Sequence, residues 1–248
     1  DAADANTAFG LIPHKCINFQ GRNITKPESN WVDLTASLPS RVGHIFEGSL
    51  DADGTLSGYL HTSYYGYAAN NRREEIKKFN SLEEYYEDYA EKTTQFTILE
   101  HKVEYLDDPN FSLVEITKID LKNAANIKNN SITFNPFIVG RTTKNPFNLD
   151  ERSYPVDLSS KIETGIELTI KIPEGYHLSA TNKNVGMALP DRDARYTYTV
   201  KEDDENIQIK VTNSMNKPLF MPKEYLDLKE FFSRIIQSQK IDIELNKS

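Results

Sequence analysis

The sequence is short of cysteine, of basic clusters and of long apolar runs, and each shortage excludes a class of structure. Cys16 is the only cysteine among 248 residues, which excludes an internal disulfide and a cysteine-rich zinc site. Acidic residues outnumber basic ones by 37 to 29, and no run of Lys and Arg is longer than Arg72-Arg73, so binding to nucleic acid is not expected. No apolar run approaches the roughly 20 residues that span a bilayer, so no transmembrane segment is expected.

The patterns that are present predict a folded protein made mainly of β-strands. The chain has 13 Tyr and 12 Phe, and long stretches alternate between apolar and polar residues. Two such runs flank Asp51-Ala52-Asp53-Gly54, where an Asp-Gly pair favours a hairpin turn. Further strands are predicted at residues 96–106, 111–121, 131–139, 165–176 and 241–245, with a second hairpin over 194–213.

Two amphipathic helices complete the predicted fold. Ser81 and Glu84 have the spacing of a capping box at the start of a helix over residues 80–95. Pro222 suits the first turn of a second helix, over residues 223–240. We therefore expect a mainly β fold with a few helices, arranged as two β-sandwich-like antiparallel modules that each carry one helix. The expected divisions are residues 1–45 as a leading segment, 46–145 as the first module and 146–248 as the second.

Residues that could carry chemistry are few. His14 and Cys16 suggest a base and a thiol nucleophile, but two residues on one strand face lie roughly 6.6 Å apart along the strand. A nucleophile and its base need about 3 Å between heavy atoms. Cys16 is therefore interpreted as a buried structural thiol, since a free cysteine packs like a small apolar residue.

No metal site or cofactor site is predicted. A calcium loop starting at Asp51 needs Gly at its sixth position and Glu at its twelfth, whereas Gly54 is fourth and Thr62 is twelfth. A plain turn is the better interpretation. Asp191 and Asp193 form a carboxylate pair in sequence, for which a solvated turn is favoured over paired acids across a cleft. The histidines, at positions 14, 44, 61, 101 and 177, lack metal-ligand spacing.

The tyrosines of one predicted strand are the candidate binding residues. Tyr64, Tyr65 and Tyr67 could form a platform on which sugar rings or a peptide stack, since aromatic faces offer amphipathic contact area. The alternative is ordinary sheet packing, because aromatic residues are favoured on pleated, half-buried surfaces. An exposed row at these positions would favour the platform.

Several segments follow one another in a recognisable order: "DAAD", "FGLIPHKCINFQGR", "WVDL", "LDADGTLSGYLHTSYYGYAA", "NPFNLDERSYPVDL", "IPEGYHL", "ALPDRDARYTYTV" and "PKEYLDLKEFFSRIIQSQ". In this order they resemble the C-terminal, β-rich region of exported bacterial transglutaminase-like proteins, chiefly of Bacteroidetes. The resemblance covers nearly the whole chain.

The resemblance implies a parent protein with an export signal, an N-terminal β-rich domain and a papain-like transglutaminase core with a Cys-His-Asp triad. In the family, a segment similar to "DAAD" ends that core, so Asp1 matches the triad aspartate. The strands with the nucleophilic Cys and the His would lie upstream of Asp1. By this resemblance the chain is a piece of a longer protein, found in the periplasm or cell envelope.

Three functional hypotheses follow. The first is a non-catalytic accessory region that supports or positions the transglutaminase-like core of its parent protein, with no catalytic residue in this chain alone other than the match at Asp1. The second is a binding module for a cell-envelope polymer or peptide, acting through Tyr64, Tyr65 and Tyr67. The third is an independent enzyme that uses Cys16 or the pair Asp191 and Asp193.

Overall fold

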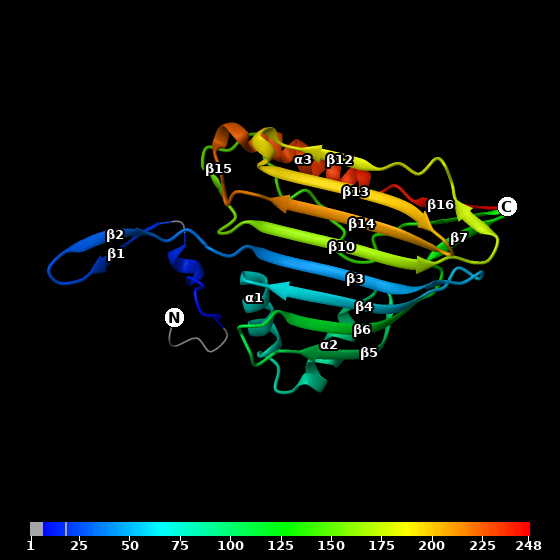
Figure 1. Cartoon of the computed structure of the whole chain (residues 1–248), viewed down its shortest axis with the longest axis horizontal. Coiled ribbons are helices and arrows are strands. Elements are labelled where there is room, and N and C mark those ends of the chain that lie inside the picture. The colour runs from blue at the N-terminus through cyan, green and yellow to red at the C-terminus, as the bar shows by residue number, and fades with distance from the viewer. Residues whose placement is uncertain (1–6, 18) are drawn as a thin grey trace.

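The computed structural model describes residues 7–17 and 19–248, and an eight-stranded sheet is its central feature (Figure 1). All neighbouring strands of this sheet are antiparallel except β10 and β3, which run parallel. In spatial order the strands are β12 (Val185–Ala188), β13 (Ala194–Asp203), β14 (Asn206–Met215), β10 (Ile162–Lys171), β3 (Ser40–Leu50), β4 (Leu56–Tyr65), β6 (Leu113–Leu121) and β5 (Thr97–Glu104).

Alternation of apolar and polar residues gives this sheet one covered face and one open face. In β10, Ile166, Leu168 and Ile170 are buried, while Glu167 and Lys171 between and after them are exposed. The open face carries many charged and hydroxyl side chains, and cross-strand ion pairs such as Glu167 with Lys210 form on it. The covered face therefore holds the core.

The remaining strands are short. Hairpin β1 (Gln20–Ile24) and β2 (Ser29–Asp33) projects from the body of the molecule (Figure 1). A four-stranded sheet consists of β11 (Tyr176–Leu178), β16 (Ile243–Lys247), β8 (Ser131–Phe134) and β7 (Ala125–Lys128), and β9 (Val156–Asp157) pairs with β15 (Leu219–Phe220). Single 3-10 turns are η1 (His14–Cys16), η2 (Pro190–Arg192) and η3 (Pro222–Glu224).

Helices cover parts of the inner face of the large sheet: α1 (Tyr67–Ile76), α2 (Leu82–Lys92) and α3 (Tyr225–Ser238) (Figure 1). The predicted cap of α2 is confirmed, because Ser81 Oγ accepts a hydrogen bond from Glu84 N at 3.2 Å. Helix α3 buries Leu228 and Ile235, as its amphipathic pattern predicts. Among the described residues, no helix combines the length and the apolar character needed to cross a membrane.

Most of the buried apolar residues form one large cluster between the eight-stranded sheet, α3 and the small sheet. Phe46 of β3, Ile170 of β10, Leu228 of α3 and Ile243 next to the C-terminus all belong to it. A smaller cluster fills the space under α1 and α2 and includes Tyr85 of α2 and Leu113 of β6. Apolar burial of this kind stabilises a fold by about 25 cal/mol for each Å² removed from water.

The structure confirms the expected mainly β fold with a few helices and antiparallel sheets. The strands of the two expected modules lie in one sheet, because β3 pairs with β10 from Ser40 beside Ile162 to Ser49 beside Lys171. Strand β8, before residue 145, also pairs with β16 at the other end of the chain. The boundary near residue 145 stays a prediction, and strand pairing crosses it at two places.

Candidate functional site

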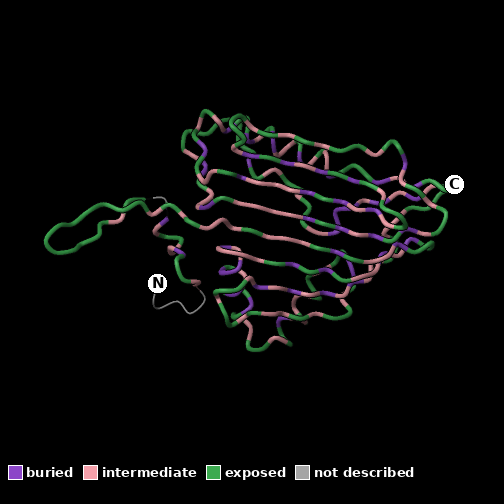
Figure 2. Tube along the Cα trace, viewed as in Figure 1, coloured by how far each residue is buried: buried purple, intermediate pink, exposed green. Residues whose placement is uncertain are grey.

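The projecting hairpin, here called the arm (residues 19–33), exposes large apolar side chains. Phe19, Ile24 and Trp31 are 69%, 84% and 60% exposed. Figure 2 shows the arm as an almost continuous run of exposed residues away from the buried strands. A two-stranded hairpin has no core of its own. The register places Ile24 and Trp31 on one face of the hairpin, and strand alternation places Phe19 on the other, so each face of the arm exposes a large apolar side chain.

The segment before the arm is fixed to the start of helix α1. The Tyr67 hydroxyl donates to Ile12 O at 2.9 Å and accepts from Ile12 N at 3.2 Å. Leu11, Ile17 and Tyr67 are buried together in a small apolar cluster. Since both backbone groups of Ile12 bind one side chain, the chain leading into the arm is held on the body at a defined place.

His14 and Cys16 both lie in the single turn η1, at the edge of this attachment. His14 Nε2 lies 3.2 Å from Asn71 Oδ1, and its ring centroid is 4.7 Å from that of Tyr67. The ring of His14 is thus engaged by helix α1. Cys16 is a free, half-buried thiol, so it is less buried than expected. Asp1, the match to the triad aspartate, lies outside the described residues.

The three candidate tyrosines do not form the exposed row that the sequence suggested. Strand β4 ends at Tyr65, and helix α1 begins at Tyr67. Gly66 joins the two elements with a φ of 61°. Tyr67 is 3% exposed. Tyr64 lies on the covered face with Arg72 at 5.6 Å from its ring, and Tyr65 lies on the open face with Arg41 at 5.5 Å. The expected strand through Tyr67 therefore ends at Tyr65, and a ligand-binding role for the three tyrosines stays a prediction.

The aspartates at positions 51, 53, 191 and 193 lie in or beside turns. Asp53 Oδ1 accepts from Thr55 N at 2.9 Å, and Gly54 N donates to Asp51 O at 2.9 Å, which confirms a plain turn between β3 and β4. Asp193 forms an ion pair with Lys217 beside turn η2.

The histidines are dispersed over the structure. His44 is held in the interior, where burial lowers its pKa to about 4. His177 Nδ1 lies 2.7 Å from Glu202 Oε1, and His61 is exposed on β4. Within residues 7–17 and 19–248, no three His, Cys, Asp or Glu side chains gather as a metal site would require.

A buried polar cluster that the sequence reasoning missed lies under α1 and α2; it is called here the Glu115 network. It consists of Glu115 of β6, Arg72 of α1, Tyr85 of α2 and His101 of β5. Arg72 Nε donates to Glu115 Oε1 at 2.5 Å, and the Tyr85 hydroxyl donates to Glu115 Oε2 at 2.7 Å. His101 Nε2 lies 2.9 Å from Glu115 Oε2. One carboxylate thus connects two helices and two strands.

Burial and charge act in opposite directions within the Glu115 network. Burial alone would raise the pKa of Glu115, but hydrogen bonds from His101, Arg72 and Tyr85 and the charge of Arg72 outweigh it. The pKa of Glu115 is lowered to about 2. Burial and the neighbouring carboxylate raise the pKa of Tyr85 far above its usual value. Glu115 is therefore a carboxylate and Tyr85 a neutral phenol at neutral pH.

The Glu115 carboxylate is buried, although Arg72 and Tyr85 of the network also line a pocket at the surface between α1 and α2. Glu115 is 2% exposed, and the rings of Tyr86 and Tyr89 each lie 4.7 Å from the His101 ring between centroids. Its chemistry therefore serves attachment of the helices to the sheet. The sequence did contain a signal, because Glu115 occupies an inward position in the alternation of "LVEITKIDL". A buried acid requires a partner, and its partner Arg72 is 43 positions away in the chain.

Arg73, the neighbour of Arg72, also holds the fold together. Arg73 is 1% exposed and donates to four backbone carbonyls of the loop between β5 and β6. The distances are 3.2 Å to Leu106 O, 2.9 Å to Tyr105 O, 2.9 Å to Asp108 O and 2.8 Å to Phe111 O. The Arg72-Arg73 pair thus faces the protein interior.

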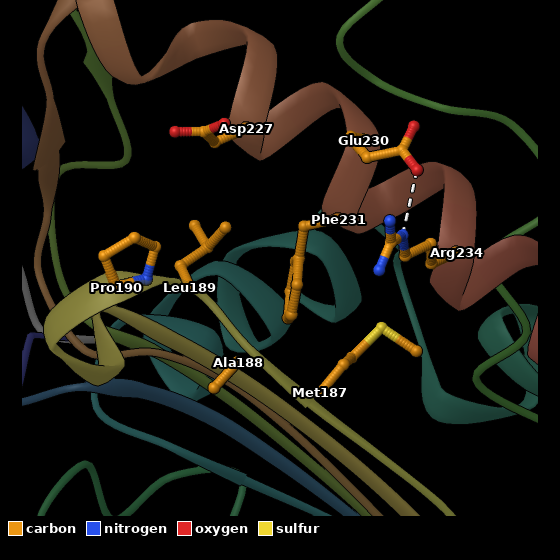
Figure 3. A pocket seen from close by; sticks show the side chains of 8 residues that line it. All are labelled: Met187, Ala188, Leu189, Pro190, Asp227, Glu230, Phe231 and Arg234. Carbon is orange, nitrogen blue, oxygen red and sulfur yellow. Dashed lines mark hydrogen bonds and ion pairs between the residues drawn. The ribbon is translucent and has the colours of Figure 1, made fainter.

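A groove of about 180 Å³ lies between the edge strand β12 and helix α3 (Figure 3). Met187 and Leu189 come from the strand side, and the Phe231 ring projects from α3 into the space between them. Asp227 and Glu230 stand on the helix side of the groove. The groove thus combines a sheet edge with apolar and acidic side chains.

The geometry defines a mainly β protein with a projecting arm, a largely buried polar network and an edge groove. Residues 130–245, from the start of β8 through most of β16, match the model of DUF3858, a domain of unknown function with a solved structure. No curated protein matches the chain. A crystal structure described as a "putative protease from Parabacteroides distasonis ATCC 8503" is 16% identical, with a TM-score of 0.38 over 55% of this chain. The match spans 31% of that longer chain.

Proposed function

We propose that the chain is a non-catalytic accessory region that binds and supports a transglutaminase-like core through its arm. The observation that carries the proposal is the exposure of Phe19, Ile24 and Trp31 on a hairpin without a core of its own. Large exposed apolar side chains on one short projecting segment are typical of protein interaction sites. The identity of the partner rests on the sequence resemblance, which also implies an exported protein of the periplasm or cell envelope.

The attachment of the arm supports a positioning role. Tyr67 binds both backbone groups of Ile12, and Leu11 and Ile17 pack beside it, so the chain entering the arm is anchored to α1. Helix α1 is in turn tied to the sheet through Arg72 and Glu115. A partner that packs on the arm is therefore connected to the body through ordered contacts, and less entropy is lost when it binds.

The described residues also favour a role without catalysis. Acyl transfer needs a thiolate, a base and an oxyanion site that converge on one atom. His14 is engaged by Asn71 and Tyr67, and Glu115 is buried under the helices. We expect neither amine incorporation nor peptidase activity from this chain with model substrates. Turnover that is abolished by Cys16→Ala would contradict the proposal.

The binding role is tested with the polypeptide encoded directly upstream of this chain, produced separately and titrated against it by calorimetry. The proposal expects that polypeptide to contain a Cys and a His at transglutaminase spacing. Trp31→Ala is expected to weaken binding by about 2 kcal/mol, or roughly 30-fold, as for a central aromatic of an interface. Tyr154→Ala is the matched control, because Tyr154 is an exposed aromatic residue outside the arm.

Two results would reject this function. One is an upstream sequence without the Cys and His pair, which removes the proposed partner. The other is equal affinity of the Trp31→Ala protein, the Tyr154→Ala protein and the unchanged chain, which removes the arm as the binding surface.

A further inference from the structure

We propose that the outer edge of β12 and the groove beside α3 bind an extended peptide segment that carries an apolar side chain and, two positions away, a Lys or Arg side chain. The peptide adds a strand to the eight-stranded sheet. This site lies in a different part of the fold from the arm, and the proposal does not depend on the function proposed for the arm.

The backbone of β12 supplies the first part of the site. Among the described strands, β12 is an end strand of the sheet and pairs only with β13. Leu189 N donates to Ala194 O at 3.0 Å, so this pair is a hydrogen-bonded one. Because hydrogen bonding alternates along an antiparallel strand, the N–H and C=O groups of Gly186 and Ala188 point to the outer edge. Both residues are exposed, so the edge offers two alternate residues to an added strand.

The two ends of the sheet differ in how they are protected. The opposite end strand, β5, has a bulge between Ile98 and Glu100 and carries Lys102 and Glu104. Bulges and charged side chains are the features that keep sheet edges from pairing with other chains. Strand β12, with the sequence Val-Gly-Met-Ala, has neither feature. Its edge is therefore open to pairing.

The groove supplies a pocket for one side chain of the added strand. Alternate side chains of a strand point to one face of the sheet. On the α3 side, Met187, Leu189 and Phe231 line the groove of about 180 Å³ (Figure 3). An apolar side chain of the peptide would be removed from water there.

Charge determines which peptide fits. Within the part of the chain that the structure describes, Asp227 has no ion-pair partner, while Glu230 pairs with Arg234 at 2.9 Å (Figure 3). The groove therefore has two carboxylates and one guanidinium, with one negative charge in excess. A Lys or Arg side chain two positions from the apolar one lies on the same face and reaches Asp227. A second copy of this chain is disfavoured, because its own Asp227 and Glu230 would approach like charges.

The test uses the full chain and two short fluorescein-labelled peptides in which Thr alternates with Val and Lys, or with Val and Glu. Binding is followed by fluorescence anisotropy. We expect saturable binding of the Lys peptide. Gly186→Pro removes an outward N–H and should weaken this binding about tenfold. Gly186→Ala is the matched control, since a Cβ at this position meets no atom within 4 Å and the N–H is kept; binding should change less than about twofold.

A second variant tests the charge without altering the backbone. Asp227→Lys should reverse the preference, so that the Glu peptide binds more tightly than the Lys peptide by about fivefold. The Asp227→Lys test remains valid even if circular dichroism shows that the Gly186→Pro protein is not folded. The proposal is overturned by the absence of saturable binding, by equal binding of both peptides to the unchanged chain, or by equal affinities of a folded Gly186→Pro protein and the Gly186→Ala protein. Self-association that Gly186→Pro abolishes, without peptide binding, would also overturn it and assign the edge to a second copy.

Discussion

At the scale of single residues, Glu115 does the most to connect separate elements. Its carboxylate accepts from Arg72, Tyr85 and His101, which come from α1, α2 and β5. An ion pair in the interior adds little over a well-packed apolar substitute, but removal of one partner leaves the other charged and buried. The Glu115 network therefore acts as a constraint on which helices can cover this part of the sheet.

We expect Glu115→Gln to lower the free energy of unfolding at pH 7 by about 3 kcal/mol, because Arg72 then loses its buried counter-charge and keeps only the exposed Glu75. The effect depends on pH. The pKa of Glu115 falls from its ordinary 4.5 to about 2 on folding. Its contribution is therefore complete above about pH 4.5 and disappears as the pH falls toward 2. Urea unfolding at pH 7 and at pH 3 measures both effects, and the difference between the two proteins should be smaller at pH 3.

The control for this prediction is Glu163→Gln. Glu163 pairs with Arg41 at 2.6 Å on the open face of the sheet, where both side chains are well exposed. Such a pair contributes about 0–1 kcal/mol. If both substitutions have the same small effect at pH 7, the Glu115 network does not hold the helices on the sheet.

At the scale of elements, strands β3 and β4 approach each other closely where two glycines face each other. Gly48 lies beside Gly58 in the register, and both lie on the core side together with the Phe46 ring. A Cβ at Gly48 would be 2.1 Å from Ser57 O and 2.6 Å from Phe46 Cζ. The glycines are therefore required by the close approach of the facing strand's backbone and by the Phe46 ring.

Gly48→Ala is expected to lower the free energy of unfolding by about 3 kcal/mol, since either the strand or the Phe46 ring must move. Gly165→Ala in β10 is the matched strand-glycine control, because its Cβ would meet no atom within 4 Å. It should change stability by less than about 1 kcal/mol, through the lower entropy of the unfolded chain. The two variants are compared by urea unfolding, through their midpoint concentrations, provided that the dependence of the unfolding free energy on urea is the same for both. Similar midpoints for the two variants would contradict the close approach.

The elements also show which parts of the fold could be predicted from sequence. Helix α2, its Ser81 cap and the alternation of β10 were predictable, because each signal is local. Helix α1 was not, since "YAANNRREEI" has little apolar periodicity and its stabilising contacts come from Glu115 and from the β5–β6 loop. Gly66 marked the change from strand to helix, but a glycine alone does not show which structure follows.

At the scale of the whole molecule, the decisive contact is the parallel pairing of β3 with β10. Ser40 lies beside Ile162, so residues more than a hundred positions apart are neighbours. Long-range pairing leaves no local pattern in either strand, which explains why the sequence suggested two separate modules. The groove beside β12 was unpredictable for the same reason, because it needs residues 187–189 next to α3. The apolar residues of the arm can be read from the sequence, but their exposure to solvent cannot be predicted from it.

This pairing leads to a prediction about fragments. Residues 130–248 alone lack β3, so the long β10 edge, with its buried face of Ile166, Leu168 and Ile170, has no neighbour on that side. Unpaired edges of this kind associate with other chains. We expect the fragment to aggregate or to unfold at a lower temperature than the full chain, which should unfold in one transition by calorimetry. Replacing residues 20–33 by a short Gly-Ser linker is the control and should leave that transition unchanged, since the arm has no buried core residue. A monomeric fragment with the stability of the whole chain would instead establish an independent C-terminal domain.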